Sequence, residues 1–108
     1  MAIPHAGPGE LIDATPLGDR LLEEKTHTLV KQENLEIIRM ILPAGKEIPA
    51  HTAPRMIIVQ CLEGRILFTA DDHEFDMVPG NIIYLQPKVR HAVLAVDNSA
   101  VLLTIVGD

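Results

Sequence analysis

The chain has 108 residues, of which 47% are hydrophobic and 22% charged, and its formal net charge is −6. This length is enough for one domain with a buried core and too short for two. No apolar run is long enough to cross a membrane, and no basic stretch followed by an apolar segment marks a secretory signal. Nine Lys and Arg against fifteen Asp and Glu leave no basic patch for a phosphate backbone. We therefore expect neither a membrane nor a nucleic acid as partner.

Cysteine and aromatic usage give two further expectations. The single cysteine, Cys61, cannot form an internal disulfide, which favours a reducing, cytoplasmic location. The chain has no Trp, one Tyr and two Phe, so almost all of its apolar residues are aliphatic. This surplus of aliphatic side chains in a short chain indicates a buried subunit interface. We expect a homodimer formed through faces of Leu35–Leu42 and Ala100–Val106.

Residues 1–25 differ in composition from the rest of the chain. Pro and Gly residues recur through the first twenty positions, a pattern typical of extended or turning chain. We expect an N-terminal arm that lies on the domain surface or on a neighbouring subunit, with one helical turn near residues 21–25. A partly disordered tail is the alternative.

Residues 26–108 are predicted to form the domain itself. Short segments rich in Ile and Val alternate with turn residues, and none carries a sustained helical stripe of apolar residues. The predicted strands are 26–31, 35–42, 55–62, 65–70, 73–78, 81–85, 89–96 and 100–106. Short strands at regular spacing predict an all-β sandwich or barrel with little helix.

Two of the five histidines, His51 and His91, lie in similar surroundings, each where a loop leads into a strand. His51 follows Gly45 by six residues and precedes Gly64 by thirteen, and His91 follows Gly80 by eleven. If the two loops fold against each other, both imidazoles lie at one mouth of the barrel.

These spacings resemble the two motifs of the cupin superfamily, G(X)5HXH(X)3–4E(X)6G and G(X)5PXG(X)2H(X)3N. The resemblance extends over about residues 26–106 and is strongest at Leu62-Glu63-Gly64 and Pro79-Gly80. It implies a double-stranded β-helix, which is a small jelly-roll barrel and commonly a homodimer. In metal-binding members the motifs supply three histidines and one glutamate to a single divalent transition metal.

Only half of that ligand set is present in this chain. His51 and His91 occupy two of the positions, whereas Ala53 stands at the second histidine and Ile57 at the glutamate. A transition metal normally takes three or four protein ligands, and two imidazoles alone bind weakly. Two interpretations stay open: a divalent transition metal (Fe, Mn, Ni, Cu or Zn) held by His51 and His91, or a metal-free pocket.

The second motif departs from the family at three further positions. Gln86 and Lys88 stand at its Pro and Gly positions, and Ala95 stands at the final Asn.

Four other polar residues are candidates for the pocket. Cys61 lies on the barrel-facing side of its strand by the period of two, as a soft third ligand or as a small buried hydrophobe. Tyr84 and Gln86 share one strand face and would give a polar handle beside His91. Arg39 is the single charge in an apolar run: facing inward it would recognise a carboxylate, and facing outward it would border an interface.

Three functions follow from this sequence. The first is a small-molecule-binding cupin barrel whose pocket is centred on the two histidines. The second is a metal-dependent cupin enzyme of the oxygenase or isomerase type with a reduced two-histidine site. The third is a sensory or regulatory cupin module that acts with a protein partner.

Overall fold

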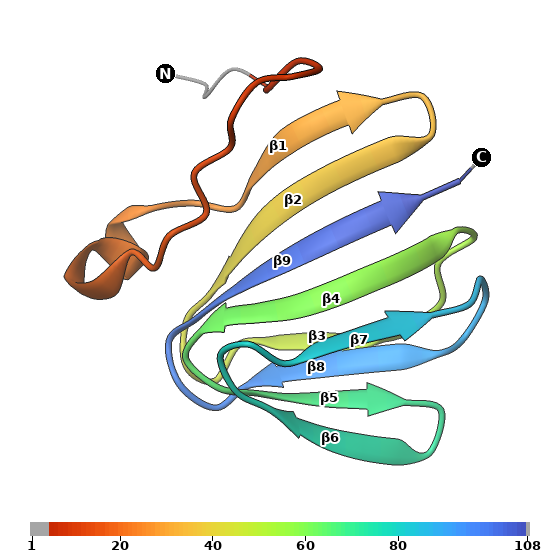
Figure 1. The fold of residues 1–108 in the computed structure, drawn as a ribbon. Coiled ribbons are helices and arrows are strands. Elements are labelled where there is room, and N and C mark those ends of the chain that lie inside the picture. Colours follow the sequence, from red (N-terminus) through yellow and green to blue (C-terminus); the bar gives the residue numbers. More distant parts are fainter. Residues whose placement is uncertain (1–4, 108) are drawn as a thin grey trace.

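The computed structural model describes residues 5–107, which form nine strands and one short 3₁₀ helix (Figure 1). The elements are η1 (Gly18–Glu23), β1 (His27–Gln32), β2 (Leu35–Leu42), β3 (Glu47–His51), β4 (Met56–Glu63), β5 (Ile66–Ala70), β6 (His73–Met77), β7 (Ile82–Leu85), β8 (His91–Ala95) and β9 (Ser99–Val106). All strand pairs are antiparallel. The predicted all-β class is thus confirmed.

The strands form two sheets that face each other. The larger sheet has the order β1-β2-β9-β4-β7, and the smaller one has the order β3-β8-β5-β6 (Figure 1). The eight predicted strands are all present, with shifts of one or two residues at most ends. Strand β3 was not predicted because Pro49 interrupts it. Proline is tolerated there because β3 is an edge strand that pairs only with β8.

The core lies between the two sheets. Along β4, the buried residues Ile57, Val59 and Cys61 alternate with less buried neighbours, as the period of two predicts. Ile66 and Phe68 of β5 face them from the smaller sheet and are almost fully buried. The interior is therefore filled by aliphatic side chains of two sheets rather than by helices.

The N-terminal segment follows the outer side of the larger sheet (Figure 1). The Ala6 N–H donates to the Leu29 carbonyl at 2.7 Å. Farther along, the Glu63 carboxylate accepts hydrogen bonds from the N–H groups of Leu17 (2.7 Å) and Gly18 (3.1 Å). The helical turn expected near 21–25 begins earlier, as η1, and residues 1–4 of the predicted arm lie outside the described residues.

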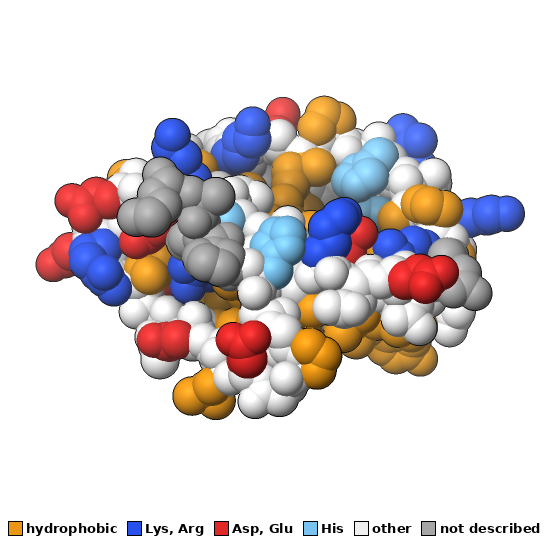
Figure 2. Space-filling view, turned by 90° about the horizontal axis from the view of Figure 1, so that it is seen from above, with side chains coloured by type: hydrophobic (Ala, Val, Ile, Leu, Met, Phe, Trp, Pro, Cys, Tyr) orange, Lys and Arg blue, Asp and Glu red, His pale blue; other side chains and the backbone are white. Residues whose placement is uncertain are grey.

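The surface carries charges of both signs. On the face seen in Figure 2, Lys and Arg side chains are scattered among Asp and Glu and do not gather in one patch. No helix within residues 5–107 is long and apolar enough to span a bilayer.

Candidate functional site

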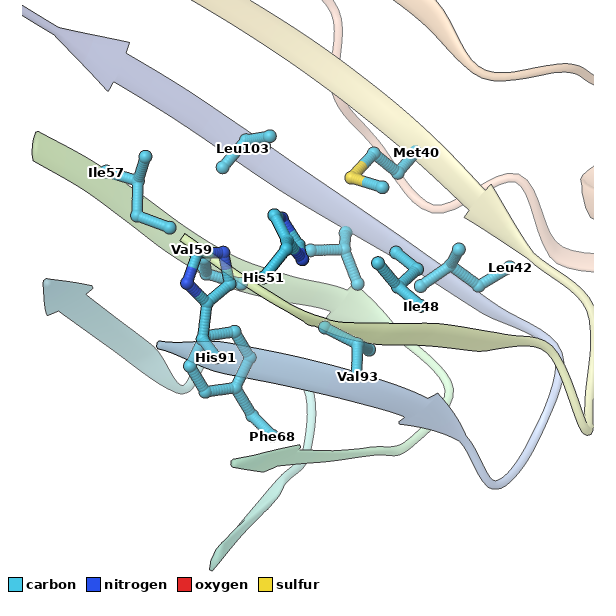
Figure 3. Close-up of a pocket in the computed structure, with 11 residues that line it drawn as sticks. Met40, Leu42, Ile48, His51, Ile57, Val59, Phe68, His91, Val93 and Leu103 are labelled. Atoms are coloured by element: carbon cyan, nitrogen blue, oxygen red, sulfur yellow. The ribbon is translucent and has the colours of Figure 1, made fainter. Parts of the chain in front are cut away.

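A cavity of about 90 Å³ lies between the two sheets, with strands of both in its walls. Its apolar walls are formed by Met40, Leu42, Ile48, Ile57, Val59, Phe68, Val93, Val101 and Leu103. The polar lining residues are His51 of β3 and His91 of β8, which point toward each other into the space between the sheets (Figure 3).

The two histidines form a cross-strand pair. They are direct partners in the β3–β8 register, and their ring centroids are 4.3 Å apart at an interplanar angle of 57°. His91 is only 6% exposed and stacks on Phe68 with a centroid distance of 5.9 Å, whereas His51 is exposed. The cavity therefore has its dry end at His91 and its solvent contact at His51.

Backbone carbonyls fix the tautomer of both rings. Nδ1 of His51 lies 2.9 Å from the Pro49 carbonyl oxygen, and Nδ1 of His91 lies 2.9 Å from that of Val89. A carbonyl oxygen only accepts, so Nδ1 carries the proton in each ring. The Nε2 atom of each ring has no hydrogen-bond partner among residues 5–107 and is left as an acceptor at the cavity.

Comparison with known proteins identifies the family. The model of the family described as "Cupin domain" matches residues 38–107, which is most of the chain and includes both histidine segments. The chain belongs to the cupin family. Comparison with curated proteins gives no match.

Solved structures agree with this assignment. A conserved protein of unknown function from Streptococcus pyogenes is 25% identical, with a TM-score of 0.76 over 100% of this chain and 96% of that one. A cupin superfamily protein from Desulfitobacterium hafniense is 19% identical, with a TM-score of 0.76 over 91% and 95% of the two chains. An RmlC-like cupin with a double-stranded β-helix fold from Methanocaldococcus jannaschii is 19% identical, with a TM-score of 0.73 over 94% of each chain. The predicted double-stranded β-helix is confirmed.

The donor set of this cupin does not fit a resident transition metal. The family's other two ligand positions hold Ala53, which packs against the core, and Ile57, which is 3% exposed within it. Within residues 5–107, no three His, Cys, Asp or Glu side chains come close enough together to hold a metal ion. Two imidazoles without a carboxylate fall short of the three or four ligands such an ion normally takes.

Cys61 does not supply the missing ligand. Its side chain is fully buried and faces the interior, but it does not line the cavity, and its Sγ donates to the Glu63 carbonyl oxygen at 3.6 Å. Burial raises the pKa of the Cys61 thiol, which disfavours the thiolate that binds metals. The interpretation of Cys61 as a small buried hydrophobe is the one that the structure supports.

Tyr84 and Gln86 do not provide the expected polar handle beside His91. On β7, Leu85 is buried and Ile83 packs against the core, so the alternation turns Tyr84 outward, where it is 63% exposed. Gln86 follows the end of β7 and is exposed. Neither residue lines the cavity.

Arg39 faces outward and not into this cavity. Its chain neighbour Met40 lines the cavity, and successive residues of a strand point to opposite faces. Sequence reasoning also missed Phe68, the ring that supports His91. The signal was available, because Phe68 is one of two phenylalanines and shares a strand face with Ile66 and Ala70 in the predicted strand 65–70.

Proposed function

We propose that this cupin binds a small, largely apolar molecule that carries one or two N–H or O–H donors. The observation that carries the proposal is the pair of free Nε2 acceptors, on His51 and His91, in a cavity whose remaining walls are apolar. An apolar cavity with a few convergent polar groups is the usual form of a small-molecule site. Donors on the ligand would satisfy the two imidazoles, and aliphatic contacts would supply the rest of the affinity.

The size of the cavity limits the ligand. A volume of about 90 Å³ corresponds to roughly three water molecules at about 30 Å³ each, and an engineered cavity of about 150 Å³ binds benzene. The enclosed part of the ligand is therefore smaller than a benzene ring. A longer molecule would insert only one end, and the rest of it would extend into solvent past the exposed His51.

Isobutyramide is a suitable probe because its branched aliphatic end is smaller than a benzene ring and its amide group has two N–H donors. Isobutyronitrile has the same aliphatic group and no donor, so it serves as the matched ligand control. We expect isobutyramide to shift the imidazole NMR signals of His51 and His91 and to raise the Tm. Saturation at 100 times Kd would stabilise the folded state by about 2.7 kcal/mol.

The matched variants are His91→Leu, which removes one acceptor but keeps an apolar wall, and His73→Leu. His73 is the exposed first residue of β6 and does not line the cavity, so its replacement should leave binding unchanged. Equal binding of the nitrile, or unchanged amide binding by His91→Leu, would refute the proposal.

The metal-dependent enzyme is the second candidate, favoured only by the two free Nε2 atoms. Titration with Zn²⁺ and Co²⁺ separates the two functions. Tight one-to-one binding that is lost in His91→Leu, together with no binding of isobutyramide, would select the metal site instead. The homodimer and the cytoplasmic location stay predictions. Sedimentation of the wild type would test the homodimer, and a monomer at micromolar concentration would contradict it.

A further inference from the structure

A second cavity, of about 250 Å³, lies on the outer side of the larger sheet, under the N-terminal segment. Its walls are formed by Ala6, Leu11, Ile12, Asp13, His27, Leu29 and Arg39. Arg39 of β2 is the register partner of His27 of β1, so their side chains share the outer face of the sheet. The sheet separates this cavity from the two-histidine cavity, because Arg39 and Met40 point to opposite sides of it.

Arg39 is a buried cation without a direct ion-pair partner among the described residues. It is 8% exposed, makes no hydrogen bond or ion pair within residues 5–107, and its Nε is fully shielded and unpaired. The partly buried Arg55 differs, since it donates to the Gly107 carbonyl at 2.6 Å and lies 3.5 Å from the Glu36 carboxylate. A buried guanidinium without a partner is strongly unfavourable. Of the residues that line this cavity, Arg39 is therefore the one that an anionic ligand would stabilise most.

The acidic side chain that shares the cavity is already engaged. Oδ1 of Asp13 accepts hydrogen bonds from the Thr15 N–H (3.0 Å) and the Thr15 hydroxyl (2.7 Å), and Asp13 forms no ion pair with Arg39. His27 has its Nδ1 3.1 Å from the Lys25 carbonyl oxygen, so this nitrogen donates. The cavity thus offers a guanidinium that no carboxylate contacts directly, next to apolar walls, and the Asp13 charge acts on it only at longer range.

We propose that this cavity binds a small monocarboxylate, with the carboxylate on Arg39 and the aliphatic part against Ile12 and Leu29. A guanidinium matches a carboxylate through two parallel N–H···O bonds. The negative charge of Asp13 disfavours a dianion such as phosphate. Two kinds of molecule could supply the carboxylate. One is a simple fatty acid, and the other is an α-amino acid whose ammonium group lies near Asp13.

The bound molecule would join the N-terminal segment to the β1–β2 pair. Three of the residues that line the cavity are residues 11–13, and the others are Ala6 and residues of β1 and β2. Occupancy should therefore slow cleavage of the segment by trypsin at Arg20 and Lys25. This readout does not depend on any catalytic activity.

The test uses isobutyrate and L-valine as probes, measured by titration calorimetry. We expect one-to-one binding to the wild type and to Arg65→Met, in which an exposed arginine of the β4–β5 turn is changed. Arg39→Met should weaken binding by about 10- to 100-fold, the range expected for a charged hydrogen bond. Arg39→Lys keeps the positive charge but not the two parallel N–H donors of the guanidinium, and should weaken binding less than Arg39→Met does. Tighter binding of L-valine that is lost in Asp13→Asn would identify the amino acid as the source.

The inner cavity provides an internal control. Isobutyramide binding should survive Arg39→Met and be lost in His91→Leu, whereas isobutyrate binding should show the reverse, so the two proposals fail separately. Without ligand, Arg39→Met should have a higher Tm than the wild type because an unpaired buried charge is gone. Undiminished isobutyrate binding by Arg39→Met would overturn the proposal. A second result would also overturn the proposal: the wild type binds neither probe and is a dimer, and Arg39→Met is a monomer. The counter-charge of Arg39 would then be supplied by a second copy of the chain.

Discussion

Gly64, in the turn between β4 and β5, is expected to be the most sensitive glycine of this cupin. Its φ is +83°, in the left-handed region, and a Cβ built there would collide with the Ser99 hydroxyl and the Asn98 carbonyl oxygen and lie 2.7 Å from the Ser99 Cα. Ser99 is fully buried. Its hydroxyl accepts from the Arg65 N–H at 3.0 Å and donates to the Asp97 carbonyl at 2.7 Å. Gly64→Ala would thus disturb a buried link between two turns.

The magnitude follows from three contributions. Left-handed backbone costs a residue with a Cβ about 1–2 kcal/mol, and disrupted buried hydrogen bonds cost about 1–3 kcal/mol. The lower entropy of alanine in the unfolded chain offsets about 0.5–1 kcal/mol. We expect Gly64→Ala to lower the free energy of unfolding by about 1.5–4 kcal/mol. Gly45→Ala is the matched control, because Gly45 has a φ of +87° with open space around it, and should cost only about 0.5–1 kcal/mol.

The assay is urea unfolding followed by far-UV circular dichroism, since the chain has no Trp to report by fluorescence. The two variants should have equal m-values and different midpoints. Equal losses in Gly64→Ala and Gly45→Ala would show that the close approach of Ser99 does not matter. The steric part of the reasoning would then be wrong, and only the backbone conformation would remain as the cause.

Three further predictions concern single residues. Lys88 has a φ of +71°, so Lys88→Gly should raise stability by about 0.5–1 kcal/mol and the Tm by about 2–8 °C, whereas Lys88→Ala, which keeps a Cβ, should not. The Cys61 thiol, whose pKa is raised by burial, should react with Ellman's reagent only as fast as the protein unfolds; rapid reaction in the native state would contradict its burial. The hydrogen bond from Arg65 holds the pKa of Asp76 below its ordinary value of 3.8. This ion pair stabilises the fold above pH 3.8, and its contribution is lost as the pH falls through the lowered pKa of Asp76. Asp76→Asn should therefore flatten the acid limb of a profile of stability against pH. An unchanged acid limb would show that the ion pair contributes nothing to stability.

The sequence predicted those parts of the structure that depend on local alternation. The period of two placed Ile57, Val59 and Cys61 inside, and their burial confirms it. It could not place Tyr84, because β7 has only four residues and the register with β4 decides which face turns inward. The orientation of Arg39 was equally undecidable, since both faces of β2 carry aliphatic residues and only the packed N-terminal segment shows that its outer face is covered.

The departures of this cupin from the metal-binding motif lie in side chains, while the groups that position the histidines belong to the backbone. Lys88, at the motif's glycine position, has a left-handed φ of +71°, and its N–H donates to the carbonyl of Ala53 at 2.8 Å. This backbone hydrogen bond joins the two loops at Ala53 and Lys88, two positions where the chain departs from the motif. It involves the side chain of neither residue. The carbonyl bonds to the His51 and His91 rings are likewise made by the backbone. Replacing two ligands by Ala53 and Ile57 therefore leaves the imidazole pair in place and makes its surroundings apolar, which suits a neutral ligand better than a cation.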